Sequence, residues 1–427
     1  MKVAWLIPRV TKGSGGHRTI IQNLNLLIDN GYECDIYVKN DVEFTESEIE
    51  KQINEFYMPC SAKVYKGWKS NKEYDIVFAT SWDTVNFANK FKTKEKFYFI
   101  QDYEPWFFPM SDNYIFAENT YKEDYKAITI GKWLSYKLNK EFGMKTSYFD
   151  FCADLNIYKN NKNIKKEDAI CCIFQPNKSR RCINLLLNSI KIINKVRPDI
   201  KIYLYGSEKQ NIKGVNVENL GIISPLELNK LYNKCKIGVS MSSSNPSRIP
   251  FEMMASGLPV VELYRENNLY DMPDDCVMLS ESTPEALATT IISLYEDDTR
   301  RENLSKNSIN YMQNYPLEKG YDQFISAFNY LLNNNSSDKK IEKLYKEKQI
   351  KAKKEYKSIL LDEEEQNVLT TDEIINGYEN ENKELRRLLN ESNNQINKIL
   401  NSKRWKISGI ITMPFKIFRR KKWKKYQ

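Results

Sequence analysis

The stretch NPSRIPFEMMASGLPVV, residues 245–261, carries the strongest pattern in this 427-residue chain. It predicts a loop, a helix with Glu252 in its first turn, a Gly-x-Pro turn and the first residues of a buried strand. A helix start offers free backbone N–H groups and a partial positive charge, which suit a diphosphate. A carboxylate there can accept hydrogen bonds from vicinal sugar hydroxyls. The alternative is an ordinary amphipathic helix between two strands.

Around this stretch, apolar strands alternate with amphipathic helices along the chain. Strands are predicted at residues 3–8, 34–38, 74–80, 97–101, 127–130 and 147–151, and again at 169–174, 201–205, 236–241 and 259–263. Helices are predicted at residues 132–142, 181–193, 226–235, 284–295 and 299–315. This order predicts an α/β fold with two Rossmann-like domains, residues 1–157 and 158–315, joined by a hinge near 154–166. Ligands should bind at the carboxyl ends of the strands, in the cleft between the domains.

Composition and charge narrow the class of protein. A hydrophobic fraction of 41% is enough to bury real cores, and the eight cysteines include no Cys-x-x-Cys pair, so we expect reduced thiols and no zinc site. The apolar start at residues 1–8 is too short for a signal peptide, and no window is long enough to span a bilayer. We therefore expect a cytoplasmic protein.

The C-terminal region differs from the rest. Residues 336–402 are rich in Lys, Glu and Asn, and Tyr378, Leu385, Ser392 and Ile399 recur at intervals of seven. This pattern predicts a helical extension, either a coiled-coil dimer or a solvated single helix. Residues 403–427 hold ten of the 65 basic residues and no acidic one, interleaved with tryptophan and aliphatic side chains.

Such a basic amphipathic tail is typical of a segment that binds an anionic membrane surface. A nucleic-acid partner is disfavoured, because the body of the chain is close to neutral. A plain solvated tail is the third interpretation.

Further segments carry a family resemblance. They are Gly15–Ile20 (GGHRTI), Phe99–Pro109 (FIQDYEPWFFP), Ala117–Tyr121 (AENTY) and Ile130–Leu134 (IGKWL). Together with residues 245–261, they resemble the WsaF-type rhamnosyltransferases, which are family-4 GT-B glycosyltransferases that use dTDP-L-rhamnose to build bacterial surface polysaccharides. The resemblance covers about residues 1–335 and implies two facing Rossmann-like domains, with a helix within residues 316–335 that crosses back onto the first.

The resemblance also implies roles for particular residues. Glu252 would hold the nucleotide ribose, while cationic side chains would neutralise the diphosphate and the loop after residue 205 would receive the nucleobase. The donor-binding candidates are Gly15, Gly16, Lys178, Arg180, Arg181, Gly206, Ser207, Ser247, Arg248 and Glu252. Two positions depart from the family: Ser244 stands where many relatives carry a second glutamate, and Gln175 where many carry arginine.

The catalytic candidates lie in the first domain. His17 is the only histidine and follows a glycine-rich turn at the end of the first strand, where it can contact the donor sugar or phosphate. Asp102 and Glu104 follow a strand end beside aromatic residues, an arrangement that suits a sugar acceptor, and one of them can accept the acceptor proton. A surface turn residue and a capped turn are the respective alternatives. No two aspartates occur at Asp-x-Asp spacing, so we expect metal-independent transfer without a cofactor, in which the nucleotide sugar is a substrate.

These observations predict a hexosyltransferase that extends a lipid-linked glycan at the inner face of the cell membrane, and the resemblance implies a retaining rhamnosyltransferase. A homodimer or a polysaccharide-assembly complex is a further expected partner. Two alternatives remain open: a nucleotide-sugar epimerase of the same fold, and a non-catalytic scaffold of that fold, which Ser244 and Gln175 would favour.

Overall fold

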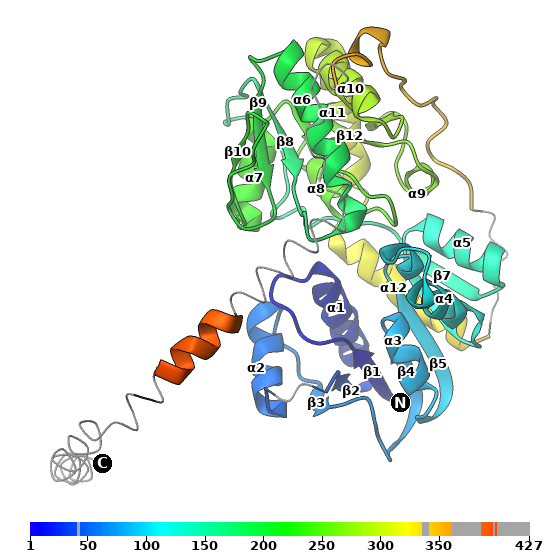
Figure 1. Ribbon diagram of the computed structural model, residues 1–427. Helices are drawn as coiled ribbons and strands as arrows, with labels where there is room; N and C mark the ends of the chain where they lie inside the picture. The colour runs from blue at the N-terminus through cyan, green and yellow to red at the C-terminus, as the bar shows by residue number, and fades with distance from the viewer. Residues whose placement is uncertain (41–42, 335–340, 361–385, 396–397, 399–427) are drawn as a thin grey trace, which may run out of the picture. The chain divides into compact units, whose positions relative to one another are not determined.

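The computed structural model describes residues 1–40, 43–334, 341–360, 386–395 and 398. The chain forms two compact units, Met1–Glu363 and Glu364–Gln427. The larger unit contains two sheets, each covered by helices (Figure 1). The α/β class and the two Rossmann-like halves predicted from the sequence are confirmed.

The first sheet has seven parallel strands in the order β3-β2-β1-β4-β5-β6-β7. Their bounds are β1 Lys2–Ile7, β2 Glu33–Val38, β3 Lys63–Lys66, β4 Glu73–Ala79, β5 Lys92–Ile100, β6 Lys126–Ile130 and β7 Lys145–Phe149. The associated α-helices are α1 Gly15–Asp29, α2 Glu46–Phe56, α3 Trp82–Ala88, α4 Asp112–Asn119 and α5 Lys132–Phe142. At the core, the rings of Trp5 and Phe78 stack with centroids 4.0 Å apart, and both side chains are fully buried.

The second sheet has six parallel strands in the order β10-β9-β8-β11-β12-β13. Their bounds are β8 Ala169–Ile173, β9 Lys201–Tyr205, β10 Glu218–Asn219, β11 Ile237–Val239, β12 Val260–Leu263 and β13 Val277–Ser280. The associated helices are α6 Ile183–Val196, α7 Pro225–Lys234, α8 Ile249–Ala255, α9 Glu266–Leu269, α10 Pro284–Glu296 and α11 Asp298–Met312.

The continuous apolar sequence of β8 reflects burial on both faces of the sheet. Ile170 and Cys172 belong to the cluster that contains Leu186 and Ile190 of α6, whereas Cys171 belongs to the opposite cluster. Central strands of parallel sheets are covered on both sides in this way, so their sequences do not alternate between apolar and polar residues.

In both sheets the strand order reverses beside the first strand, between β1 and β4 and between β8 and β11. Ligands of open α/β sheets bind at this point, outside the carboxyl ends of the strands. The fold therefore indicates the segments that follow β8 and β11 as the candidate ligand-binding segments of the second half.

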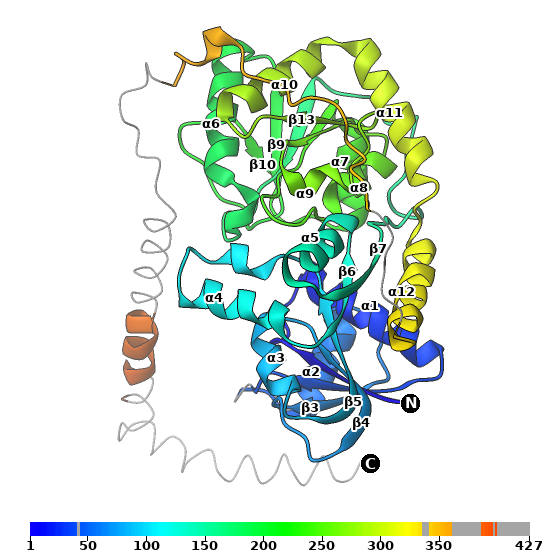
Figure 2. The ribbon, with the colours of Figure 1, turned by 90° about the vertical axis from the view of Figure 1, so that its right-hand side faces the viewer.

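The last helix of the fold returns to the first half, as predicted. α12 (Leu317–Leu332) packs against β7 and α1 (Figure 2). The ring of Phe324 meets Phe99, and that of Phe328 meets Phe78. Both phenylalanines are fully buried, so this helix completes the core of the first sheet.

Some predicted elements differ in the structure. α1 begins at Gly15 because the Ser14 hydroxyl caps it, so Gly15, Gly16 and His17 lie in the first helical turn rather than in a loop. Residues 341–360 contain one turn of 3-10 helix, Lys354–Tyr356, and otherwise no regular helix, and their backbone pairs with the second half. Ile350 N–H donates to Leu279 O at 3.1 Å, and Tyr345 N–H donates to Leu269 O at 2.9 Å.

The predictions for the C-terminal region fall largely outside the described residues. Residues 386–395 are helical and exposed, including Leu388 and Leu389. Tyr378, Leu385, Ile399 and the whole basic tail at 403–427 are not among the described residues. Within the described part of the chain, no helix is long and apolar enough to cross a bilayer.

Candidate functional site

A turn rich in cations follows β8 at the point where the second sheet reverses its strand order. It contains Lys178, Arg180 and Arg181, with Ser179–Arg181 forming one turn of 3-10 helix. Gln175 organises the turn: its Oε1 accepts hydrogen bonds from Lys178 Nζ and from Arg181 Nε, both at 3.3 Å. Gln175, which departs from the family pattern, therefore fixes two cations by its side-chain oxygen.

The two arginines of this turn have different environments. Arg181 is only 3% exposed, and its Nη1 donates to Met241 O at 3.1 Å and to Ser247 Oγ at 3.2 Å. Arg180 is more accessible and lies over the Phe107 ring, 5.0 Å from its centroid. Arg180 is thus the better placed of the two to meet a ligand, while Arg181 supports the turn from beneath.

Lys178 is half-buried beside these arginines. Burial, followed by repulsion from Arg180 and Arg181, lowers its pKa from 10.5 to about 8. A cluster of positive charge in which one member is ready to lose its proton gains free energy when an anion binds. The chemistry of this turn fits a phosphate or diphosphate group.

A serine-rich loop after β11 joins this turn to the first half. Asp102, at the end of β5, accepts from Asn245 N–H at 2.8 Å and from Ser244 Oγ–H at 3.0 Å, and its Oδ2 lies 3.6 Å from Arg180 Nε. Burial raises the pKa of Asp102, and Arg180 opposes that effect. Asp102 therefore connects the halves through both carboxylate oxygens, and it brings a carboxylate to Ser244, where the family pattern has a glutamate.

Asn245 strengthens the same connection. Its side-chain amide donates to Gln101 O and to Ile130 O, each at 2.9 Å, and the residue is 2% exposed. It thereby bridges the ends of β5 and β6 from the opposite half. Gln101 in turn donates to Gly16 O at 3.2 Å, so the first turn of α1 also reaches this edge.

A second carboxylate makes the reverse connection. Asp271, in the second half, accepts from Lys132 N–H at 2.7 Å and from Trp133 N–H at 3.2 Å, which caps the start of α5 in the first half. Gly131 has φ +86°, and a Cβ there would lie 2.5 Å from Phe151 and 3.1 Å from Asp271. Only glycine permits this close approach, and burial raises the pKa of Asp271 to about 6.

Glu252 forms a separate cluster on α8. Its carboxylate lies beside Tyr158 and Arg248, and burial, the largest effect, raises its pKa to about 7 although both neighbours lower it. Arg18 of α1 adds positive charge nearby, and Arg248 Nη1 donates to Gln22 of α1 at 3.3 Å. The structure thus sets the predicted ribose-binding carboxylate opposite the start of α1.

The predicted nucleobase loop lies beside the cation-rich turn. Gly206 has φ +105°, and a Cβ there would lie 2.6 Å from Ile173 at the end of β8 and 3.5 Å from the Gln175 side chain. Glycine is therefore needed at this position. Gly206 and Ser207 are both partly accessible.

His17 is held by its own surroundings. Its Nδ1 is 2.8 Å from Ser14 Oγ, its Nε2 is 3.5 Å from Pro8 O, and its ring stacks on Tyr57 with centroids 5.7 Å apart. Burial lowers the pKa of His17, and the Pro8 carbonyl partly opposes this effect. The ring is neutral near pH 7, and both nitrogens have internal partners.

Glu104 caps the start of a helix of the first half. It is 8% exposed, and its Oε2 accepts from Trp82 N–H at 2.6 Å at the start of α3 and from Tyr98 Oη–H at 3.4 Å. Burial raises its pKa to about 8. This geometry corresponds to the capped turn that was the alternative interpretation of the sequence.

Some residues of this region were missed in the sequence. Asn245 is the first residue of the stretch 245–261, but an Asn-Pro pair by itself predicts only a turn. Its contacts with the first half exist only in the tertiary fold. Asp271 lies in a loop without any recognisable motif. Within the described part of the chain, no cluster of three or more His, Cys, Asp or Glu residues could hold a metal ion.

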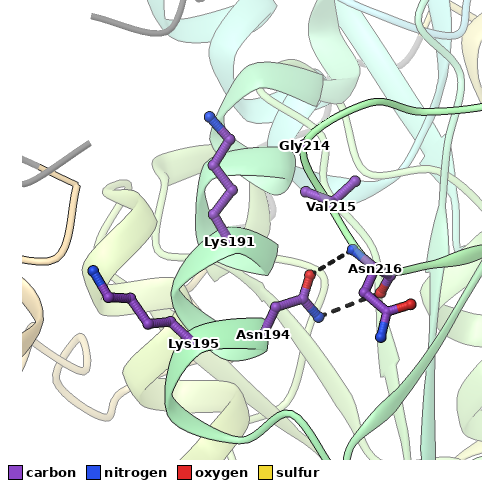
Figure 3. Close-up of a pocket in the computed structure, with 6 residues that line it drawn as sticks. All are labelled: Lys191, Asn194, Lys195, Gly214, Val215 and Asn216. Atoms are coloured by element: carbon purple, nitrogen blue, oxygen red, sulfur yellow. Dashed lines mark hydrogen bonds between the residues drawn. The ribbon is translucent and has the colours of Figure 1, made fainter. Parts of the chain in front are cut away.

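A shallow hollow of about 520 Å³ lies elsewhere, between α6 and the loop before β10 (Figure 3). Two hydrogen bonds join Asn194 and Asn216 in its lining: Asn216 N–H donates to Asn194 Oδ1 at 2.8 Å, and Asn194 Nδ2–H donates to Asn216 O at 3.3 Å. Lys191 and Lys195 extend from α6 away from this pair of asparagines (Figure 3). The hollow therefore lacks converging polar groups.

Two facing Rossmann-like halves with a cation-rich turn at the switch point of the second sheet define a GT-B fold. Residues 36–132 match the family description "WsaF, N-terminal domain", and residues 168–292 match "WsaF, C-terminal domain". Together the matches span more than half of the chain. The chain belongs to the WsaF-like GT-B glycosyltransferases.

Individual relatives agree with this assignment. The O-antigen biosynthesis protein RfbC of Myxococcus xanthus is 24% identical over 263 residues, which is 59% of this chain and 20% of that protein. The chain thus spans about a fifth of the length of this curated relative.

Two solved structures are similar to this one. Sucrose-phosphate synthase from Thermosynechococcus elongatus has a TM-score of 0.60 at 13% identity, covering 78% of this chain and 100% of the other. Anabaena HepE, in complex with UDP and glucose, has a TM-score of 0.59 at 13% identity, covering 77% and 99%. At these identities the likeness shows the fold.

Proposed function

We propose that this protein is a retaining, metal-independent hexosyltransferase, a rhamnosyltransferase using dTDP-L-rhamnose, that extends a lipid-linked bacterial surface polysaccharide. The observation that carries the proposal is the group of three cations, Lys178, Arg180 and Arg181, at the switch point of the second sheet. The name of the Myxococcus relative supports a role in polysaccharide assembly. The choice of rhamnose follows the family resemblance.

The residues can divide the work as follows. Lys178 and Arg180 bind the donor diphosphate and stabilise the negative charge that grows on it as the sugar leaves. Arginine suits this role because its planar guanidinium pairs with phosphate oxygens and stays charged. Glu252 accepts hydrogen bonds from the ribose hydroxyls, and the Gly206–Ser207 loop receives the base. Gln101 and Asp102 lie on the edge from which an acceptor hydroxyl would approach.

Nucleotide binding is the first test. Because a ligand that binds only the native state raises its melting temperature, dTDP, UDP and GDP should be compared at equal concentration. We expect the largest shift with dTDP. If none of the three nucleotides produces a shift, the proposed donor site does not exist.

Turnover is the second test. The protein should consume dTDP-L-rhamnose only when a lipid-linked glycan is added, and the product should retain the anomeric configuration. Epimerisation of a nucleotide sugar without acceptor would identify the epimerase instead. Binding without any turnover across a donor panel would favour a non-catalytic scaffold.

We further propose that residues 403–427 attach the protein to an anionic membrane surface. The full chain should sediment with vesicles that contain an anionic lipid and should be released by salt, since the attraction is electrostatic. A chain shortened at residue 402 should stay in solution. Equal sedimentation of both forms would contradict the membrane role of this tail.

A further inference from the structure

One buried carboxyl group beside the proposed donor site has no part in the mechanism described above. Glu262, on β12, is fully buried, and its Oε1 accepts from Ser242 N–H and from Leu263 N–H, both at 3.0 Å. Ser242 in turn donates from its hydroxyl to Asn245 O at 2.8 Å. The carboxyl group is therefore tied to the serine-rich loop that carries Ser244, Asn245 and Ser247.

The groups that face Glu262 come from two further segments. Arg181 and Cys182 of the cation-rich turn both interact with its charge, and Ser240 of the segment after β11 lies beside Oε2. Among the described residues, Glu262 Oε2 and Ser240 Oγ have no hydrogen-bond partner of normal geometry. Burial of a carboxyl group with one unpartnered oxygen costs folding free energy. A glutamate at such a buried position therefore calls for a functional explanation.

We propose that Glu262 is a positioning residue of the donor site, whose buried carboxyl group braces the serine-rich loop against the cation-rich turn. It acts on two elements at once. Through Ser242 it holds the loop that joins the two halves at Asp102, and beside Arg181 it controls the charge that lies under Lys178 and Arg180. This role rests on the proposed function, since it concerns the same donor site.

The protonation state of Glu262 determines its second effect. Burial, the largest effect, raises its pKa to about 8, while its backbone partners and Arg181 lower it. Near pH 7 the group is mostly the neutral acid, and in the described part of the chain no carboxylate forms an ion pair with Arg181. The charge of this buried guanidinium is then left to attract a diphosphate. Ionisation of Glu262 above pH 8 cancels that charge and repels the ligand.

Glutamine at position 262 reproduces the neutral acid. Its oxygen can accept from Ser242 N–H and Leu263 N–H, and its amide can donate to Ser240 Oγ. At pH 7 we expect Glu262→Gln to bind the diphosphate probes dTDP, UDP and GDP within twofold of the wild type. Glu262→Ala should bind them at least tenfold more weakly. Glu266→Gln, an exposed glutamate four residues further along, is the matched control and should change nothing.

The pH dependence of nucleotide affinity distinguishes a positioning role of Glu262 from a purely structural one. The pKa of Lys178 is also lowered to about 8, so its charge would change over the same pH range. The protein with Glu262 and the Glu262→Gln variant are therefore compared with Lys178→Arg in both, where the charge at position 178 is permanent. With Glu262 present, affinity should fall at least threefold between pH 7 and 9, because the ionised carboxylate opposes the ligand. With Glu262→Gln the fall caused by this carboxylate should be absent. The ionisation of Glu252, whose pKa is raised to about 7, is common to both forms and does not separate them.

The outcomes distinguish the two proposals. If no nucleotide binds the wild type, the proposed function fails. If nucleotide binds the wild type and a folded Glu262→Ala protein equally well, Glu262 has no positioning role. If Glu262→Ala does not fold, the glutamine comparison decides: an identical fall in affinity with and without Glu262 would overturn the inference.

Discussion

The cation-rich turn of the second half and the carboxylate edge of the first half use their charges in opposite ways. Lys178 and Arg180 are partly accessible, and the pKa of Lys178 is lowered first by burial and then by the neighbouring arginines. Glu104 is buried and Asp102 is mostly buried, and both accept hydrogen bonds from N–H and O–H donors of the protein itself. The turn therefore keeps binding capacity for a ligand, while the carboxylates hold the fold and the two halves together.

This difference supports our proposal that the donor binds to the second half and that the first half shapes the surroundings of the donor. Both regions contained charged residues at strand ends, and the sequence therefore indicated function for both. The use of the polar atoms separates them: Asp102 and Glu104 accept hydrogen bonds from the protein itself, whereas Lys178 and Arg180 keep N–H donors beyond their contacts with Gln175 and Asp102.

The largest effect should come from removing the accessible cations. Charge-assisted hydrogen bonds contribute about 1.5–3 kcal/mol each, so Lys178→Ala with Arg180→Ala should weaken nucleoside diphosphate binding more than a hundredfold. Calorimetric titration measures the change, and transfer activity should fall with it. Lys191→Ala with Lys195→Ala, on α6 beside the hollow of Figure 3, is the matched control. If Lys178→Ala with Arg180→Ala binds nucleoside diphosphates as tightly as the wild type, the cation-rich turn is not the ligand-binding region.

The second test asks whether Glu104 belongs to the fold or to the chemistry. Glu104→Ala removes the acceptor for Trp82 N–H and Tyr98 Oη–H, which should cost about 2–3 kcal/mol of stability and lower the melting temperature by several degrees. Glu104→Gln keeps an acceptor and should retain both stability and transfer activity. A folded Glu104→Gln protein without activity would restore a catalytic role.

Glu104 also predicts a dependence of stability on pH. Its pKa is raised to about 8 in the folded protein, so the native state retains a proton that the unfolded chain releases above the ordinary pKa of 4.5. Its contribution to stability is therefore complete below about pH 4.5 and is lost as the pH rises toward 8. The free energy of unfolding of the wild type should fall over this range relative to Glu104→Gln, as denaturant titrations at several pH values would show.

The third test concerns Asp102, which is proposed here as a bridge between the halves. Asp102→Asn keeps one oxygen for Asn245 N–H and a polar group for Ser244, so transfer should fall by no more than about tenfold. Loss of a general base typically costs a factor of 10²–10⁴. Single-turnover rates with saturating donor measure the difference, and a loss above a thousandfold with intact donor binding would assign the base to Asp102.

How far the sequence predicted the molecule depends on the range of the interactions. The strands that are apolar throughout, such as β8, and the helix α5 were found within a residue or two, because local periodicity encodes them, whereas α12 was expected from the family resemblance. The short strands β3, β10 and β13 went unrecognised, since two to four residues carry little pattern.

The candidate site divides in the same way. Lys178 and Arg180 were predicted from the family resemblance, at a position shortly after a predicted strand. Asp271 and Asn245 act only across the two halves, where Asn245 bridges Gln101 and Ile130, more than a hundred residues away. No local pattern contains such a contact, and the burial that turns Glu104 into a helix cap is also a property of the whole fold.

The smallest effect on donor affinity is expected at His17, which the sequence analysis proposed as a contact of the donor sugar or phosphate. Because both ring nitrogens have internal partners and burial lowers its pKa, His17→Gln should change donor affinity by less than about threefold. The neutral ring stabilises the fold above the unfolded pKa of 6.5, and this contribution is lost as the pH falls through that value. Denaturant titrations at pH 5.5 and 7.5 should therefore show a smaller acid loss in His17→Gln than in the wild type. A tenfold loss of donor affinity in this variant would instead place the imidazole at the ligand and extend the binding role to the first half.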